Sequence, residues 1–257
     1  MPTELQLENE MLRKPWFYRF RLPSGRTTDS YLHENILAIH ETRERMLLAA
    51  LQETFPNGFG GLRALDLACH EGYFAHHLAK WGFGEIVGVE ARRELLERAE
   101  LMRATYGHSQ LRFQQGDVER LDAQALGRFE VVLLFGILYH VENLIGVLRL
   151  ARAVTTGVCL IETQVAPELM GSIEWGAQGF TRPIQGCLAV VNEADEVAAG
   201  NREACLGGIS LCPSLHALQW LLRAVGFQSS VVLPPPAGAY EQLARGKRVM
   251  VAAYPGA

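Results

Sequence analysis

Short apolar segments that alternate with helical ones constrain the fold of this 257-residue chain more than any other feature. The apolar segments have the length of strands and run nearly uninterrupted, as strands do when both faces of a sheet are covered. Strands that alternate with helices form parallel sheets with right-handed crossovers. We therefore predict an α/β fold with a doubly wound, mostly parallel sheet. Strands are predicted at 62–67, 86–90, 111–115, 129–135 and 158–162, and helices at 72–81, 92–106 and 144–154.

Both ends of the chain extend this pattern. Residues 1–33 are rich in aromatic side chains and are predicted to be irregular. A helix is predicted at 34–55, because its apolar residues recur at helical spacing. A second helix is predicted at 214–225, and two more strands at 227–233 and 248–254. The chain thus supplies seven strands to one sheet.

The segment 163–212, after the fifth strand, shows no clear period and contains many glycines. A structureless loop of this length is uncommon in a compact domain, so the segment is either a folded insertion or a lid. The predicted organisation is an N-terminal aromatic-rich cap and helix at 1–57, followed by a main domain at 58–257. Within that domain, 163–212 is predicted to be a lid or substrate-binding insertion.

The composition disfavours several classes of protein. A net charge of −4 gives no general attraction to nucleic acid. No apolar stretch approaches the roughly 20 residues that cross a bilayer, and the first residues do not resemble a secretory signal. The five cysteines are scattered without a CxxC pair, which disfavours a disulfide framework or a structural zinc site. We expect a cytoplasmic monomer or homodimer with no metal and no membrane contact.

The most informative stretch is 64–74, ALDLACHEGYF, in which a buried strand leads through small residues into a helix. Such a junction lets a ligand approach the backbone and the positive end of the helix. Glu90 ends the second strand, 24 positions after Asp66, and an acid there can accept both hydroxyls of a ribose. Asp117 follows the third strand, where a carboxylate can meet the exocyclic amine of an adenine.

These residues resemble the class I S-adenosylmethionine-dependent methyltransferase family over residues 60–255. The first strand of that family carries a D/E-x-G-x-G-x-G motif. Asp66 and Gly72 match it, while Ala68 and His70 occupy the first two glycine positions. The resemblance implies S-adenosylmethionine as cofactor, bound across the carboxyl ends of the first two strands, and a seven-stranded sheet whose last strand is antiparallel. The cofactor-binding residues that it implies are Asp66, Ala68, His70, Gly72, Tyr73, Phe74, Glu90, Ala91, Asp117, Val118, Phe135 and Gly136.

Other segments match the same family. Residues 129–141 resemble its F-D-x-V-x-x-x-x-x-L-x-H segment, and 218–227 resemble its L-x-x-A-G-F junction from helix to strand. The aromatic leader 16–25 resembles, more weakly, a branch that includes wobble-uridine tRNA methyltransferase-like proteins and small-molecule methyltransferases. A tRNA-modifying enzyme is therefore an alternative. We favour a small-molecule acceptor, because the chain is acidic and lacks a Lys/Arg cluster.

Methyl transfer is a direct displacement, so the protein mainly has to align the reactants and exclude water. A hydroxyl or protonated amine also needs a base, for which His140, Tyr139 and, third, Glu162 are the candidates. His140 can equally have only a structural role, and the sequence does not distinguish an oxygen from a nitrogen acceptor. Two other functions stay open. One is a nicotinamide-dependent dehydrogenase, which the lack of G-x-G-x-x-G disfavours, and the other is a non-catalytic protein of this fold, suggested by Ala68 and His70.

Overall fold

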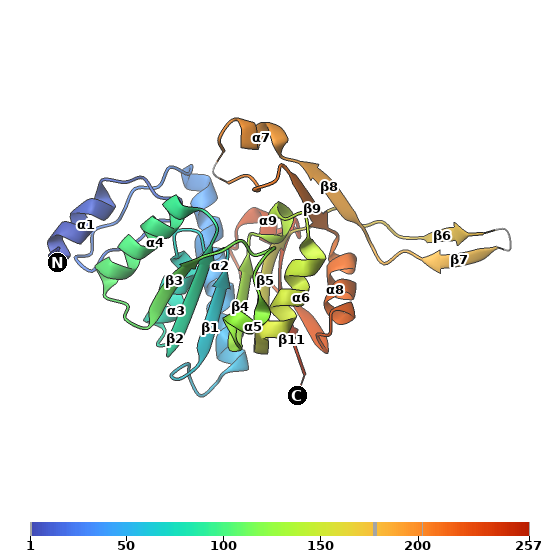
Figure 1. Cartoon of the computed structure of the whole chain (residues 1–257), viewed down its shortest axis with the longest axis horizontal. Helices are drawn as coiled ribbons and strands as arrows, with labels where there is room; N and C mark the ends of the chain where they lie inside the picture. The colour runs from blue at the N-terminus through green and yellow to red at the C-terminus, as the bar shows by residue number, and fades with distance from the viewer. Residues whose placement is uncertain (1, 177–178, 202, 257) are drawn as a thin grey trace.

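A computed structural model describes residues 2–176, 179–201 and 203–256, and a seven-stranded sheet forms its centre (Figure 1). Its strands are β1 (Arg63–Leu67), β2 (Glu85–Glu90), β3 (Leu111–Gln115), β4 (Phe129–Phe135), β5 (Thr155–Gln164), β10 (Ser229–Leu233) and β11 (Arg248–Tyr254). Their order across the sheet is β10-β11-β5-β4-β1-β2-β3. Neighbours pair in parallel, except that β11 runs antiparallel to β5 and β10. The predicted sheet, including its antiparallel last strand, is confirmed.

Helices cover both faces of this sheet and bury two apolar clusters. They are α2 (Glu34–Thr54), α3 (Tyr73–Lys80), α4 (Arg93–Tyr106), α5 (Ala123–Leu126), α6 (Leu144–Val154), α8 (Leu215–Ala224) and α9 (Glu241–Ala244). Val131 and Leu133 of β4 face the cluster that includes residues of α2, α3 and α4. Val132 and Leu134 face the cluster that includes residues of α5, α6 and α8. This alternation is the two-residue period of a strand buried on both faces.

None of the helices in the described part of the chain combines the length and the apolar character needed to cross a membrane.

The N-terminal segment contains a helix, α1 (Glu4–Leu12), where the sequence predicted irregular structure. Thr3 and Gln6 form a capping box in which the N–H of Gln6 donates to the Thr3 hydroxyl and the N–H of Thr3 donates to the Gln6 side chain. The apolar residues of this helix do not gather on one face, and Leu5 is exposed, so its hydrophobic period is too weak to predict it. The cap and the burial of Met11 stabilise it instead, and the prediction was wrong here.

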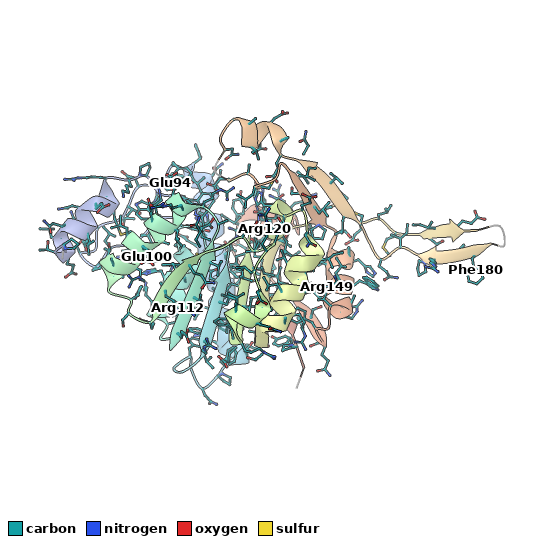
Figure 2. All side chains as sticks on the ribbon, in the orientation of Figure 1. Glu94, Glu100, Arg112, Arg120, Arg149 and Phe180 are labelled. Atoms are coloured by element: carbon teal, nitrogen blue, oxygen red, sulfur yellow. The ribbon has the colours of Figure 1, made fainter. Side chains whose placement is uncertain are left out.

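The segment 163–212 begins with a hairpin of β6 (Ser172–Trp175) and β7 (Phe180–Pro183) that projects from the body of the molecule (Figure 1). Phe180 lies on this hairpin far from the central sheet (Figure 2), and its side chain is exposed. Short strands that bury neither face carry no hydrophobic alternation, which explains why the sequence shows no period here.

The rest of this segment lies closer to the sheet. β8 (Leu188–Asn192) and β9 (Ile209–Pro213) form an antiparallel pair. Between them in the chain is α7 (Ala194–Ala198), which lies above the carboxyl ends of the central strands (Figure 1). The insertion therefore has its own secondary structure, and its two parts occupy different places on the molecule.

Candidate active site

A cavity of about 320 Å³ lies at the carboxyl ends of β1, β2 and β4, the edge where ligands bind in open α/β sheets. The N-terminal segment, the 3-10 helix η1 (Leu138–His140) and the loop after α7 complete its wall. Many predicted site residues line it: Ala68, His70, Glu90, Ala91, Asp117, Val118, Phe135, Gly136, Tyr139 and His140. The wall also contains residues that the sequence analysis did not single out for the site, among them Arg43, Gln164, Glu203, Cys205 and Arg248.

The turn after β1 places two non-glycine residues, Ala68 (φ 60°) and His70 (φ 55°), in the left-handed region of backbone conformation. These are the first two glycine positions of the family motif, and a side chain there costs about 1–2 kcal/mol. The N–H of His70 donates to the Glu90 carboxylate (3.0 Å). Its ring forms an ion pair with Glu203 (Nε2–Oε2 3.3 Å) and packs against Phe17 (ring centroids 4.9 Å apart). These contacts hold the turn in the conformation that the motif requires.

Two carboxylates border the cavity over β2 and β3. Glu90 ends β2, and its two oxygens accept hydrogen bonds from the backbone N–H groups of His70 (3.0 Å) and Arg92 (2.8 Å). Asp117 follows β3 and accepts a hydrogen bond from the N–H of Glu119 (3.0 Å). Backbone donors hold both carboxylates in fixed orientations, so each can accept further hydrogen bonds from a ligand.

Several residues of the predicted cofactor set lie behind the wall and do not line the cavity. Gly72 begins α3, and a Cβ there would lie 2.7 Å from a Phe113 ring carbon and 2.8 Å from the Met102 methyl carbon. Its φ of 79° also favours glycine. Packing and backbone conformation therefore require this glycine without reference to a ligand. The other residues behind the wall are Asp66, Tyr73 and Phe74.

Tyr73 and Phe74 support the wall through ring contacts. Tyr73 stacks on Tyr18 (centroids 4.6 Å apart), and Phe74 meets Phe135 edge to face (4.8 Å). Tyr18 and Phe135 both line the cavity. Asp66 is fully buried in β1, and its burial raises its pKa to about 7. Tyr73 and Phe74 therefore shape the cavity indirectly, by packing against residues that line it.

Glu71 anchors the N-terminal segment beside the cavity. Its carboxylate accepts hydrogen bonds from the N–H groups of Phe17 (2.9 Å) and Tyr18 (3.2 Å). The predicted cap therefore does contribute to the wall. Burial lowers the pKa of His70, but the carboxylates of Glu203 and Glu71 outweigh it and raise the pKa above its usual value.

His140 turns its Nδ1 toward the carboxylate of Glu193 (3.1 Å to Oε2). Glu193 precedes α7 and accepts hydrogen bonds from the N–H of Cys205 (2.6 Å) and the hydroxyl of Ser210 (2.9 Å). Burial lowers the pKa of His140 below its usual value, and Glu193 offsets this only in part. The ring is therefore neutral at pH 7. With its proton on Nδ1, directed at Glu193, the lone pair of Nε2 is left as an acceptor.

Tyr139 belongs to a charged cluster on the same side of the cavity. Arg248 donates to the Tyr139 hydroxyl (2.9 Å) and to Glu162 Oε1 (3.2 Å). Arg43 forms an ion pair with Glu162 Oε2 (2.7 Å). Glu162, the third candidate base, is fully buried, does not line the cavity and has both oxygens in these ion pairs. It is not positioned to take a proton from an acceptor, which corrects that assignment.

Sequence reasoning missed Arg43, Glu193 and Arg248. Arg43 did carry a signal, because it lies on the apolar face of the helix predicted at 34–55, where a charged side chain needs a partner. Glu193 and Arg248 carried none. Their partners, His140 and Glu162, lie 53 and 86 residues away in the chain.

Comparisons with known proteins identify the family of this chain. Residues 39–230, most of the chain, match the family described as "Methyltransferase domain". The ubiquinone biosynthesis O-methyltransferase of Psychrobacter cryohalolentis is 30% identical over 116 residues, which cover 44% of this chain and 44% of that protein. The protein of the same name from Albidiferax ferrireducens is 32% identical over 89 residues, 35% of each chain. The chain thus aligns with less than half the length of these curated relatives.

Solved structures share the fold. The N-terminal domain of EvdMO1 with SAH bound superposes with a TM-score of 0.71 at 23% identity, covering 99% of this chain and 98% of that one. Magnesium protoporphyrin IX methyltransferase from Synechocystis with bound SAH gives a TM-score of 0.56 at 13% identity, covering 89% and 90%. Because the family match spans most of the chain, this protein belongs to the methyltransferase-domain family.

Proposed function

We propose that this enzyme methylates a hydroxyl oxygen of a small molecule, with His140 as the general base and Glu193 as the residue that orients it. The observation that carries this proposal is the contact between Nδ1 of His140 and the Glu193 carboxylate (3.1 Å) at the cavity wall. A histidine oriented by a carboxylate is a recurrent arrangement for removing a proton. The name of the curated relatives, O-methyltransferase, supports an oxygen acceptor.

S-adenosylmethionine would occupy the half of the cavity over β1, β2 and β3. Glu90 would accept the hydroxyls of the ribose and Asp117 the amine of the adenine, since backbone donors already fix both carboxylates. Ala68 and His70 hold the turn that lets the backbone approach the ligand. The remaining lining residues of the predicted set, which would shape this half of the cavity, are Ala91, Val118, Phe135 and Gly136.

S-adenosylmethionine, when bound, supplies a sulfonium methyl group with a good leaving group. The residues of this chain then have to align the acceptor, remove its proton and exclude water. Nε2 of His140 accepts the hydroxyl proton while the acceptor oxygen forms its bond to the methyl carbon. The Glu193 carboxylate beside Nδ1 stabilises the positive charge that the ring gains.

The acceptor would be a small molecule and not a tRNA. The net charge of −4 offers no general attraction to a phosphate backbone, and the base lies on the wall of a cavity of about 320 Å³. Of the insertion 163–212, Gln164 and residues 203–206 line this cavity, whereas the β6–β7 hairpin lies away from the body (Figure 1). We propose that the part around α7 closes over the acceptor. A cytoplasmic monomer or homodimer remains the proposed state of the protein.

The acceptor class can be tested by following the formation of S-adenosylhomocysteine with matched pairs of compounds. Catechol and 4-methylphenol would be compared with 1,2-diaminobenzene and 4-methylaniline, and a sugar hydroxyl would be compared with the corresponding amino sugar. We expect methyl transfer to one or more hydroxyl compounds and slower or no transfer to the matched amines. Transfer to the amines and not to the matched hydroxyl compounds would contradict the proposal.

A further inference from the structure

Two arginines from distant parts of the chain meet on one buried carboxylate beside the proposed base. Arg43 comes from α2 and Arg248 from the start of β11, and both pair with Glu162 of β5 at 2.7 Å and 3.2 Å. The side chains of Arg43, Arg248 and Glu162 are only 6%, 9% and 0% exposed. Both arginines line the cavity, whereas Glu162 lies behind them.

The cluster carries more positive than negative charge. Two guanidinium groups share one carboxylate. The other partners of Arg248, the Tyr139 hydroxyl and the Gln242 amide oxygen, are not carboxylates. Among the described residues, Nε of Arg43 is buried and has no hydrogen-bond partner. Nearby His40 does not change this balance of charge, since burial and the neighbouring cationic groups lower its pKa to about 2 and leave it neutral. A buried cation without a full complement of partners is costly, and an anionic ligand would remove that cost.

The position of this cluster separates it from the proposed adenosine site. Glu90 and Asp117 lie at the ends of β2 and β3, on one side of β4. The arginines lie over β5 and β11, on the other side of β4. His140 adjoins the cluster, because its ring lies 4.3 Å from that of Tyr139, over which the Arg248 guanidinium is placed at 4.8 Å. A single small acceptor can therefore reach the base and the arginines together.

We propose that the acceptor is a hydroxy acid whose carboxylate binds to Arg248 and Arg43 while its hydroxyl meets His140. The planar fork of a guanidinium matches a carboxylate, and such charge-assisted bonds are the stronger ones in proteins. Gln164, which also lines the cavity, ends β5 next to the cluster and offers a further donor. The assignment rests on the proposed methylation of a hydroxyl and names the class of molecule that carries it.

The test is calorimetric binding to the full-length protein saturated with S-adenosylhomocysteine. The probes are 4-hydroxybenzoate, 3,4-dihydroxybenzoate and 3-(4-hydroxyphenyl)propanoate, each compared with its primary amide, which keeps the shape and removes the charge. We expect at least one acid to bind about tenfold or more tightly than its amide, the scale of a charge-assisted hydrogen bond. In Arg248→Gln this preference should disappear, while the affinity for S-adenosylhomocysteine stays unchanged. Arg245→Gln, an exposed arginine three positions away, serves as the matched control.

Two results would overturn the assignment. One is the absence of any preference for the acids in the parent protein, a measurement that needs no variant and is independent of how well Arg248→Gln folds. The other is weaker binding of S-adenosylhomocysteine to Arg248→Gln with the preference for acids intact, which would assign the arginines to the carboxylate of the cofactor. Because binding does not require turnover, a failure of His140 as base would leave this measurement unaffected.

Discussion

The two halves of the cavity are built in different ways. The half over β1, β2 and β3 is formed mainly by backbone: a turn with two left-handed residues, and carboxylates held by N–H groups close to them in the chain or on the next strand. The half over β4, β5 and β11 is formed by side chains, with His140 on Glu193 and the two arginines on Glu162. A ligand that a whole family uses can be bound by residues that lie close together in the chain. Binding one particular acceptor depends instead on contacts between residues that lie far apart in the chain.

The largest loss of activity is expected from a substitution in the half of the cavity over β4, β5 and β11, where we propose that the acceptor binds. His140→Asn should lower the rate of methyl transfer by roughly 10²–10⁴-fold, the usual contribution of a general base. Affinity for S-adenosylhomocysteine, measured by calorimetry, should barely change, because the residue acts on the acceptor. His33→Asn, which replaces an exposed histidine that does not line the cavity, is the control. Near-normal turnover in His140→Asn would leave His140 as a structural residue and alignment as the source of catalysis.

On the cofactor side, Glu90→Ala should weaken binding of S-adenosylhomocysteine by about 1–3 kcal/mol, the scale of hydrogen bonds to a charged group. Glu90→Gln, which retains an acceptor for the N–H of His70 or Arg92, should lose less. Thermal unfolding of each variant shows whether the turn after β1 survives. An unchanged affinity in a folded Glu90→Ala protein would remove this residue from the cofactor site.

Glu193→Gln should reduce the rate by about tenfold, as outer partners of functional histidines commonly do. Because Glu193 raises the pKa of His140, its neutralisation should lower that pKa further. The rate falls where His140 becomes protonated, so the acid limb of the pH–rate profile should begin below pH 6.5 in the parent and move to still lower pH in the variant. Glu196→Gln, an exposed glutamate on α7, is the matched control. An unshifted profile would show that Glu193 has only a structural role.

Within the cofactor half, Gly72→Ala tests the turn without touching the ligand. In Gly72→Ala the new Cβ would clash with Phe113 and Met102, and the alanine would have to adopt a left-handed backbone conformation. Gly107→Ala also requires the left-handed conformation, but its Cβ would meet no neighbouring atom. Urea unfolding should therefore show Gly72→Ala to be less stable than Gly107→Ala by about 1–3 kcal/mol, the cost of overpacking. Equal stabilities would mean that the surrounding side chains move aside without cost.

The smallest effect is expected for His70→Gly, which restores a glycine of the family motif. Relief of the left-handed strain should offset the loss of the contacts with Glu203 and Phe17. Affinity for S-adenosylhomocysteine should stay equal or improve, and turnover should fall only if His70 touches the acceptor. A large loss of affinity would instead identify this histidine as a ligand of the cofactor.

The N-terminal segment and the insertion show where prediction from sequence ends. Helix α1 has a capping box, but its apolar residues do not gather on one face, so the hydrophobic period could not reveal it. The insertion forms a hairpin whose described strand side chains, at 172–174 and 180–183, are exposed, and a second strand pair near the cavity. In both segments the structure depends on caps, turns and contacts with the main domain, which leave little pattern in the local sequence.

The sequence by itself determined the central sheet, the five longer helices that cover it and most of the residues that line the cavity over β1, β2 and β3. Strands buried on both faces must be apolar, and a ligand at a strand–turn–helix junction needs particular residues at particular spacings, so both leave a readable pattern. Only the tertiary structure decided the acceptor side. It brought Glu193 to His140 across 53 residues and Arg248 to Glu162 across 86. It also placed Asp66, Gly72, Tyr73 and Phe74 behind the wall. An ion pair between distant residues forms because the packed layers bring the ends of strands and loops together. The spacing of residues in the sequence therefore does not predict it.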